Sequence, residues 1–235
     1  MKAIILASGI GKRLRPLTDT LPKPLLRINE KTILEYQLDH LSACNIKHVV
    51  ITTGPFEETL KTFVMKRYND FSFTFVHNPH YASTNYIYSL WLTKDEITDD
   101  ILLIHGDLLF TQTLLKKIIS GTGNRVAVNK KLKPTQKDFK AVIEHNRVRK
   151  IGVQFLEKNA FPSLPLYKFL KDDFLIWMHQ IEKEITQGKV QIYAEDAFNT
   201  ISEKIHLKPL YYTDSIPMEI DTIQDLKIAQ KLLKS

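Results

Sequence analysis

The sequence predicts a three-layer α/β fold, in which a mixed but mostly parallel central sheet lies between helices on both faces. Short, continuous apolar runs recur along the chain, as is typical of strands buried on both faces. Segments with the 3.6-residue periodicity of amphipathic helices separate these runs, and repeated alternation of strand and helix favours βαβ crossovers. The clearest apolar runs are KAIILA at 2–7, HVVITTG at 48–54 and ILLIHGD at 101–107.

The first half of the chain alternates most regularly. The run at 2–7 ends in small residues and predicts a buried first strand that leads into a loop. Apolar residues then recur at helical spacing from Thr32 to Cys44, so a helix is expected before the strand at 48–54. The following elements are expected to be a helix, a strand, a helix and a strand, at 56–68, 73–77, 86–94 and 101–107.

The second half is less regular. RVAVN at 125–129 and AVIEH at 141–145 predict strands on either side of a basic loop, and VRKIGV at 148–153 is expected to pair with the second strand as a hairpin. Helical spacing of large apolar residues predicts a helix over 168–187. Thr222 and Asp225 approximate a capping box, which predicts the start of a final helix.

Length and composition predict a single domain that covers residues 1–235. The chain is 43% hydrophobic and 25% charged, which is ordinary for a globular protein, and it contains no internal repeat or low-complexity tract. No apolar run approaches the roughly 18 to 20 residues that cross a bilayer, so we expect no membrane partner. The single cysteine, Cys44, excludes an internal disulfide and is consistent with a cytoplasmic protein. Monomeric and homo-oligomeric states both remain open.

The net charge of +7 favours polyanionic partners, which include nucleic acids and small phosphorylated molecules. Apart from KKLKPTQKDFK at 130–140, the basic residues are scattered, and neither zinc-finger spacing nor an RNA-recognition aromatic motif occurs. We therefore expect small phosphorylated ligands and no nucleic-acid partner.

The segment GIGKRLRPLTDTLPKPLL at 9–26 carries the most specific chemical signal. It follows the first strand directly, and ligands of open α/β sheets gather at the carboxyl ends of strands. Gly9 and Gly11 allow backbone N–H groups to approach phosphate oxygens closely, while Lys12, Arg13 and Lys23 supply cations for a triphosphate. Neither a dinucleotide-binding fingerprint nor a P-loop motif is present, because Leu14 replaces the third glycine of the first and no GxxxxGK[ST] occurs.

The pattern GxGxRLxPLT followed by PKPL resembles the signature of the nucleotidyltransferases that activate sugar phosphates and phosphocholine. The motifs at 77–90, 105–110, 137–140, 193–198 and 218–221 are most similar to the phosphocholine and phosphonate cytidylyltransferase branch, including the domain that attaches CMP to 2-aminoethylphosphonate. The resemblance spans most of the chain and implies the Rossmann-like nucleotidyltransferase fold. One departure is Ser8, which stands where the family usually has alanine.

The resemblance also implies roles for individual residues. Arg13 and Lys23 match the arginine and lysine that bind the nucleotide phosphates, and Asp107 and Asp221 match two aspartates that hold Mg²⁺ between them. Mg²⁺ prefers such oxygen ligands and offsets charge on the phosphates. The alternative explanations are a turn at the end of a strand for Asp107 and a helix N-cap for Asp221, and the metal role is favoured for both. The expected nucleotide-binding residues are Leu6, Ala7, Ser8, Gly9, Gly11, Lys12, Arg13, Lys23, Tyr81, Thr84, Asn85, Ser89 and Gly106.

The acceptor is expected to contact residues from the later motifs. Lys137 and Lys140 are candidates for its phosphonate or phosphate group, although solvated loop lysines would look the same. Carboxylates and aromatic faces stabilise a desolvated ammonium or choline head. The candidates for that role are Tyr193, Glu195, Asp196 and Glu219, with the start of a helix as the alternative explanation for the motif at 193–198.

These features predict a cytoplasmic, Mg²⁺-dependent cytidylyltransferase that transfers CMP from CTP to a small phosphonate or phosphate and releases pyrophosphate. A sugar-1-phosphate nucleotidyltransferase that uses UTP, dTTP or GTP is the alternative enzyme, because it shares the loop and the metal pair. A non-catalytic nucleotide-binding or nucleic-acid-binding module is the alternative of another class. The anionic acceptor oxygen needs no strong general base, so no histidine is assigned to catalysis.

Overall fold

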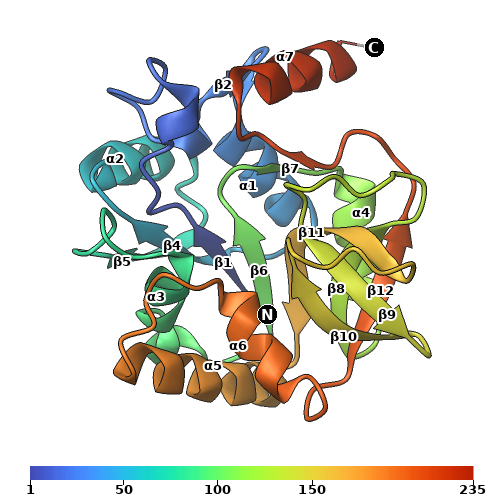
Figure 1. Ribbon diagram of the computed structural model, residues 1–235. Coiled ribbons are helices and arrows are strands. Elements are labelled where there is room, and N and C mark those ends of the chain that lie inside the picture. Colours follow the sequence, from blue (N-terminus) through green and yellow to red (C-terminus); the bar gives the residue numbers. More distant parts are fainter. Residues whose placement is uncertain (235) are drawn as a thin grey trace.

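The computed structural model describes residues 1–234, and a nine-stranded mixed sheet forms the centre of this part of the chain (Figure 1). Four neighbouring strands, in the order β6, β1, β4 and β5, are parallel, whereas β11 joins β6 in antiparallel orientation. This arrangement confirms the predicted mixed sheet. Its strands are β1 (Lys2–Leu6), β4 (His48–Thr53), β5 (Ser72–His77), β6 (Ile101–His105), β8 (Asn124–Asn129), β9 (Lys140–Glu144), β10 (Arg147–Gly152), β11 (Ala160–Phe169) and β12 (Leu207–Tyr212).

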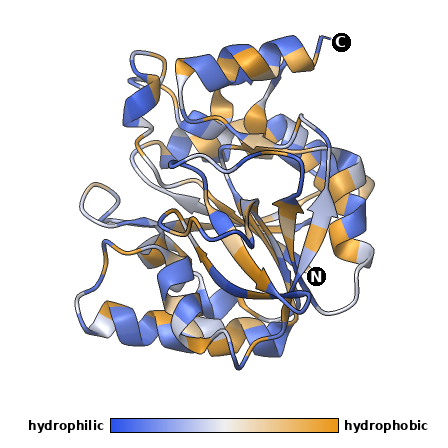
Figure 2. Cartoon of the chain, turned by 45° about the vertical axis from the view of Figure 1, so that its right-hand side comes forward, coloured by the Kyte–Doolittle hydropathy of each residue, from blue (hydrophilic) through white to orange (hydrophobic). Residues whose placement is uncertain are grey.

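Helices cover both faces of the sheet. Side chains of β1 alternate between the faces, so Ile4 packs in one apolar cluster with α3, α5 and α6, while Ile5 packs in the other with α1, α2 and α4. Figure 2 shows strongly hydrophobic stretches in the central strands, whereas hydrophobic and hydrophilic residues are intermixed along the helices. The helices are α1 (Ile33–Ala43), α2 (Glu57–Arg67), α3 (Tyr86–Trp91), α4 (Gln112–Ser120), α5 (Lys171–Thr186), α6 (Ala194–Ile201) and α7 (Ile223–Leu232), with short 3-10 turns at Lys12–Leu14, Lys23–Leu25 and Lys94–Glu96.

Two short ladders lie outside the main sheet, one a local hairpin and the other joining segments far apart in the sequence. β2 (Arg27–Ile28) pairs with β3 (Lys31–Thr32), and β7 (Leu108–Leu109) pairs with β13 (Met218–Glu219). A third apolar cluster joins Leu14 of the N-terminal loop to Leu226 of α7. The C-terminal segment is therefore fixed against both the N-terminal loop and the end of β6.

Local capping explains where two of these helices begin. Thr32 and Glu35 form a capping box at the start of α1, since each side chain bonds the other residue's backbone N–H. Thr222 and Asp225 form the predicted capping box at the start of α7, which confirms that expectation. Because Thr222 is the cap, the side chain of Asp221 is left for other contacts.

Part of the predicted helix at 168–187 is wrong. Lys168 and Phe169 end strand β11, and α5 begins at Lys171. The ten-residue β11 was not predicted, because Pro162 and Pro165 interrupt its apolar pattern and prolines are rare in central strands. Its pairing with β8 contains an irregularity between Ser163 and Tyr167, which accommodates the second proline. Strand β12 and helix α4 were also not predicted.

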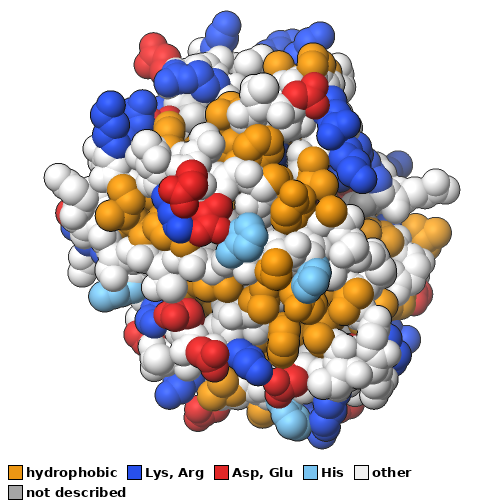
Figure 3. All heavy atoms as spheres, turned by 90° about the vertical axis from the view of Figure 1, so that its left-hand side faces the viewer, with side chains coloured by type: hydrophobic (Ala, Val, Ile, Leu, Met, Phe, Trp, Pro, Cys, Tyr) orange, Lys and Arg blue, Asp and Glu red, His pale blue; other side chains and the backbone are white. Residues whose placement is uncertain are grey.

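The edge strand β5 and its neighbours form one outer face of the molecule. Figure 3 shows that face, on which hydrophobic side chains are interspersed with basic, acidic and histidine side chains. Across residues 1–234, none of the helices is both long enough and apolar enough to cross a bilayer.

Candidate active site

A cavity of about 310 Å³ opens at the carboxyl ends of β1 and β6, where Leu6 and His105 are register partners. This is the edge at which ligands bind to parallel sheets. All thirteen residues expected to bind nucleotide line it, and they come from the loops at 6–13 and 81–89, Lys23 and Gly106. The remaining lining residues are Pro24, Asn78, Tyr86, His105, Asp107 and Asp221.

The N-terminal loop forms one wall of the cavity. Gly11 has a φ of 70°, a conformation that favours glycine, and a Cβ there would lie 3.0 Å from the Thr18 side chain. Thr18 donates a hydrogen bond of 2.8 Å to the Gly11 carbonyl. Leu14 is fully buried and anchors the loop, whereas the neighbouring Arg13 side chain remains 64% exposed. The buried Leu14 side chain therefore fixes the loop, while the Arg13 side chain remains exposed to solvent.

Lys23 joins the two distant aspartates. Its Nζ lies 2.6 Å from Asp107 Oδ2 and 2.7 Å from Asp221 Oδ1. Arg13 Nη2 lies 2.8 Å from the same Asp221 oxygen. Burial opposes the lysine charge, but the two carboxylates raise the pKa of Lys23 above its ordinary value. All four residues expected to be catalytic thus meet at one point.

Asp107 has one oxygen ready for a further cation. Burial opposes ionisation of the group, yet the Lys23 charge keeps the pKa of Asp107 below its ordinary value, so the carboxylate is ionised. Oδ2 is paired with Lys23, whereas Oδ1 is buried and finds no hydrogen-bond partner among residues 1–234. An unpartnered buried carboxylate oxygen beside a second aspartate suits a hard divalent cation such as Mg²⁺.

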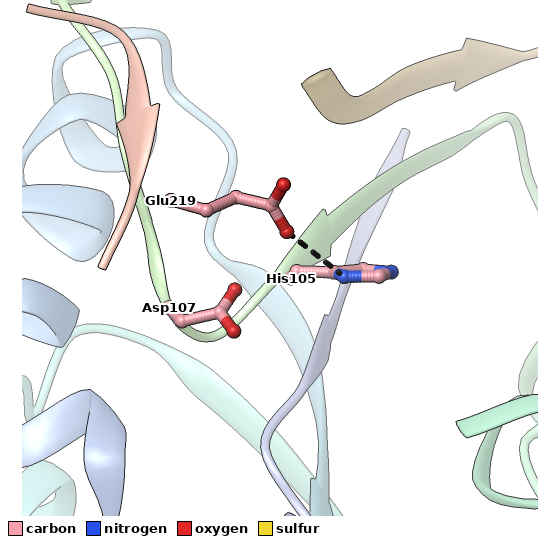
Figure 4. Close-up of side chains that lie close together, drawn as sticks. All are labelled: His105, Asp107 and Glu219. Atoms are coloured by element: carbon pink, nitrogen blue, oxygen red, sulfur yellow. Dashed lines mark ion pairs between the residues drawn. The ribbon is translucent and has the colours of Figure 1, made fainter. Parts of the chain in front are cut away.

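His105 and Glu219 extend the cluster inward. Figure 4 shows Glu219 and His105 facing each other with Asp107 close by, and their ligand atoms lie within 4.8 Å of one another. Burial lowers the pKa of His105, so its ring is neutral at pH 7. Burial, followed by the charges of Asp107 and Asp221, raises the pKa of Glu219 well above its ordinary value. Burial and the neighbouring aspartates therefore oppose a further negative charge at Glu219.

The six residues expected to bind the acceptor separate into two groups, and none of them lines the cavity itself. Glu195 and Glu219 lie behind its wall, where Glu195 accepts hydrogen bonds from Tyr86 and from Tyr167, the latter at 2.8 Å. The Tyr193 ring lies 5.8 Å from that of Tyr86 and 4.9 Å from that of Phe139. These carboxylates and rings form the acidic aromatic wall, which we define as Tyr86, Phe139, Tyr193, Glu195 and Glu219.

The other three residues make structural contacts. Asp196 accepts a 2.9 Å hydrogen bond from the backbone of Tyr193 at the start of α6, which is the helix-start alternative. Lys140 is fully buried and donates to the Thr135 carbonyl at 2.9 Å. Lys137 is 63% exposed, and its ammonium lies 3.6 Å from Asp225. Of the two lysines, Lys137 is the one with a free surface.

The structure adds polar residues that sequence reasoning did not assign. Asn78 is buried and donates hydrogen bonds to Ser89 at 2.8 Å and to Thr84 at 3.2 Å. Ser8 and Ser89 share a hydrogen bond of 2.6 Å. Asn78 thus fixes the hydroxyl groups of Thr84 and Ser89 beside the cavity. Its place at the start of the motif at 77–90 was the signal that could have identified it.

Comparisons with known proteins agree with this geometry. The sequence profile described as Nucleotidyl transferase matches residues 2–204. The chain is 26% identical to a choline-phosphate cytidylyltransferase of Streptococcus pneumoniae over all of this chain and 99% of that protein. It is 25% identical to a CMP-5'-(3-aminopropyl)phosphonate synthase of Streptomyces rubellomurinus, over 83% of this chain but 33% of that longer protein.

A solved structure extends the similarity to three dimensions. The CTP:phosphocholine cytidylyltransferase from Streptococcus pneumoniae superimposes with a TM-score of 0.83 and 25% sequence identity, covering 99% of this chain and 98% of that one. The shared fold, together with the profile match over most of the sequence, confirms the predicted family and enzyme class. The chain belongs to the nucleotidyl transferase family.

Proposed function

We propose that this nucleotidyltransferase is a Mg²⁺-dependent cytidylyltransferase that transfers CMP from CTP to a small phosphonate or phosphate of the 2-aminoethylphosphonate or phosphocholine type. The observation that carries the proposal is the meeting of Lys23, Asp107 and Asp221 at the mouth of a cavity lined by a glycine-bearing loop. The cytidylyltransferases among its relatives support the choice of CTP.

The loop at 6–13 would hold the triphosphate. Gly9 has open space around the position of a Cβ, so phosphate oxygens can approach its backbone. Lys12 and Arg13 line the cavity beside it and would neutralise the phosphate charge. Asn85 and the hydroxyl groups held by Asn78 would contact the nucleoside. The base would then lie toward α3 and the phosphates toward Lys23.

The transfer needs positioning rather than a strong base. An acceptor oxygen, already anionic, forms a bond to the α-phosphorus while the bond between that phosphorus and the bridging oxygen breaks, and pyrophosphate leaves with the electron pair. Bound Mg²⁺ would be held by Asp107 and Asp221 and would offset charge on the phosphates. Lys23 and Arg13 would turn from the aspartates toward the nucleotide and stabilise the transition state.

The acidic aromatic wall favours an acceptor with a cationic head. Burial first, and then the charges of Asp107 and Asp221, oppose ionisation of Glu219 and raise its pKa. A nearby cation would relieve that repulsion, and the rings of Tyr86 and Tyr193 would add cation–π attraction. A neutral sugar ring could donate hydrogen bonds to these carboxyl groups, but it would not supply the positive charge that relieves the repulsion.

A substrate panel tests the proposal. The four ribonucleoside triphosphates and dTTP are each combined with phosphocholine, 2-aminoethylphosphonate, hydroxyethylphosphonate and sugar 1-phosphates, and pyrophosphate release is measured with Mg²⁺. We expect turnover to be fastest with CTP and a cationic acceptor. Preference for UTP, dTTP or GTP with a sugar 1-phosphate would replace the proposal with the sugar-activating alternative. Binding of random oligonucleotides at physiological salt, without any pyrophosphate release, would indicate a binding module.

Variants link that activity to the site. Lys23→Ala and Asp107→Ala should each lower kcat/KM by about 100-fold or more, because each removes a charge that acts on the transferring phosphoryl group. Lys204→Ala, which alters an exposed lysine outside the cavity, is the matched control and should behave like wild type. Near wild-type turnover of either cavity variant would contradict the assignment.

A further inference from the structure

The turn that carries Asp107 has backbone groups that must find partners in a buried environment. The Gly106 N–H donates to the Leu6 carbonyl at 2.9 Å, and the Asp107 carbonyl accepts from Ile220 at 2.9 Å. Two further carbonyls, those of His105 and Leu108, lie on either side of the aspartate in the sequence. Buried backbone groups are rarely left unpaired, so these two need donors.

Gln37 supplies both donors from helix α1. Its side chain is 1% exposed, and Nε2 lies 2.9 Å from the His105 carbonyl and 2.7 Å from the Leu108 carbonyl. An amide NH₂ has two hydrogens, which matches the two carbonyls that bracket Asp107. Because both partners can only accept, the amide nitrogen must face the turn.

The rest of the Gln37 environment does not explain an amide at this position. Its Oε1 is buried and has no hydrogen-bond partner within residues 1–234, which is a destabilising arrangement. The neighbouring Leu34, Leu38 and Leu41 form the apolar face of α1. An apolar residue of similar size would avoid the unpaired oxygen, so contact with the turn accounts for the glutamine.

The opposite side of the turn is held by close packing. A Cβ on Gly106 would lie 2.9 Å from the Leu6 carbonyl and 2.9 Å from Pro24, the neighbour of Lys23. The turn is therefore held both by the hydrogen bonds from Gln37 and by close packing against the end of β1 and Pro24. Within it, Asp107 presents Oδ2 to Lys23 and leaves Oδ1 unpaired.

We propose that Gln37 is a positioning residue, whose amide clamps the 105–108 turn and fixes the Asp107 carboxylate in the orientation that binds the divalent cation. The inference rests on the proposed function, since it takes Asp107 as a metal ligand. Gln37 touches neither nucleotide nor acceptor. Loss of the clamp should therefore weaken metal binding and the catalytic step while leaving the CTP-binding loop intact.

The test compares Gln37→Met, which keeps length and apolar volume but has no donor, with Gln37→Glu, whose protonated form retains one donor. Mn²⁺ binding is measured by the loss of the free-ion EPR signal, alongside the Mg²⁺ activation constant, kcat, KM for CTP and the melting temperature. Leu38→Ala, at an equally buried position of the same helix, is the control for lost packing. Asp107→Asn is the control for the metal site itself.

We expect Gln37→Met to raise the Mn²⁺ dissociation constant and the Mg²⁺ activation constant by about tenfold, as is usual when an outer partner of a metal ligand is removed. Gln37→Glu should fall between Gln37→Met and wild type. KM for CTP should stay within about threefold of wild type in both, a change below one kcal/mol. Leu38→Ala should lower the melting temperature without changing the metal constants.

The remaining outcomes separate the role of Gln37 from that of the proposed metal site. Wild-type metal constants in Gln37→Met, with weakened binding in Asp107→Asn, would overturn the role of Gln37 alone. Unchanged Mn²⁺ binding in Asp107→Asn would instead refute the proposed metal site. If Gln37→Met does not fold, Gln37→Glu decides the question, and failure of both variants to fold would show that the glutamine serves the fold itself.

Discussion

Asp107 and Asp221 line the cavity and pair with Lys23, and Asp221 also pairs with Arg13, whereas Glu195 and Glu219 lie behind the cavity wall. Glu195 is 1% exposed and is held by Tyr86 and Tyr167 rather than by a cation. Such an arrangement is costly unless a ligand supplies the missing positive charge. At the scale of single residues, we therefore propose that the carboxyl groups of the site favour a cationic ligand.

Glu195→Gln tests this balance. The variant keeps the shape of the side chain and removes one negative charge from the acidic aromatic wall. KM for 2-aminoethylphosphonate should rise by about tenfold, equivalent to the loss of about 1.4 kcal/mol of attraction. KM for hydroxyethylphosphonate, which lacks the cation, and KM for CTP should change little. Steady-state kinetics with both acceptors measure the difference, and equal losses for the two acceptors would argue against a cationic head.

At the scale of elements, the capping of α7 places Asp221 beside the N-terminal loop. Thr222→Ala removes the cap and should lower the free energy of unfolding by about 1 kcal/mol. Thr111→Ala, which removes the cap of α4, is the matched control and should cost a similar amount. Urea denaturation measures both.

Only Thr222→Ala should also raise the Mg²⁺ activation constant, because Thr222 adjoins the proposed metal ligand Asp221, whereas strand β7 separates Thr111 from Asp107. If the two variants affect metal activation equally, the cap of α7 has no special part in placing Asp221.

Helix α1 also contains a group that should make stability depend on pH. Burial lowers the pKa of His40, whose ring lies 5.6 Å from that of Phe110. The unfolded chain therefore binds a proton on this histidine more readily than the folded chain does. Stability should accordingly fall as the pH drops below about 6.5, the ordinary histidine pKa.

His40→Gln should reduce the loss of folding stability at low pH. Melting temperatures between pH 7.5 and about 5, on either side of the ordinary histidine pKa, measure this effect. His179→Gln, at an exposed position of α5, should leave the pH profile unchanged. Identical profiles for wild type and His40→Gln would show that His40 does not contribute.

At the scale of the whole molecule, two apolar clusters cover the faces of one sheet, and a third joins the N-terminal loop to α7. We propose that the chain is one domain and unfolds in one cooperative step. Circular dichroism of the backbone and tryptophan fluorescence should give the same urea midpoint, because both tryptophans pack against the first cluster. Two separated transitions would indicate independent units.

The parts of this molecule that could be predicted are those with local signals. Parallel strands such as β1 and β6 are continuous apolar runs, and the capping box of α7 lies within four residues. Strand β11 was not predicted, because its prolines interrupt the apolar pattern of a strand and its pairing partners lie far away in the sequence.

The same distinction between local motifs and long-range contacts applies to the residues of the candidate site. The loop at 9–26 and the pair Asp107 and Asp221 could be identified through the resemblance, because each lies in a short recognisable motif. The burial of Lys140, the clamp by Gln37 and the network around Asn78 depend on tertiary contacts. A glutamine on the apolar face of α1 was a visible anomaly, but its partners lie 68 and 71 positions away.

The central claim is that Asp107 and Asp221 jointly hold the divalent cation beside a triphosphate bound to the N-terminal loop. Crystals of the protein grown with CTP and Mn²⁺ test it through the anomalous signal of manganese. We predict one peak within about 2.2 Å of an oxygen from each aspartate, with Lys23 turned toward the phosphates. A peak bound by neither aspartate, or a triphosphate held away from Lys23, would contradict the account.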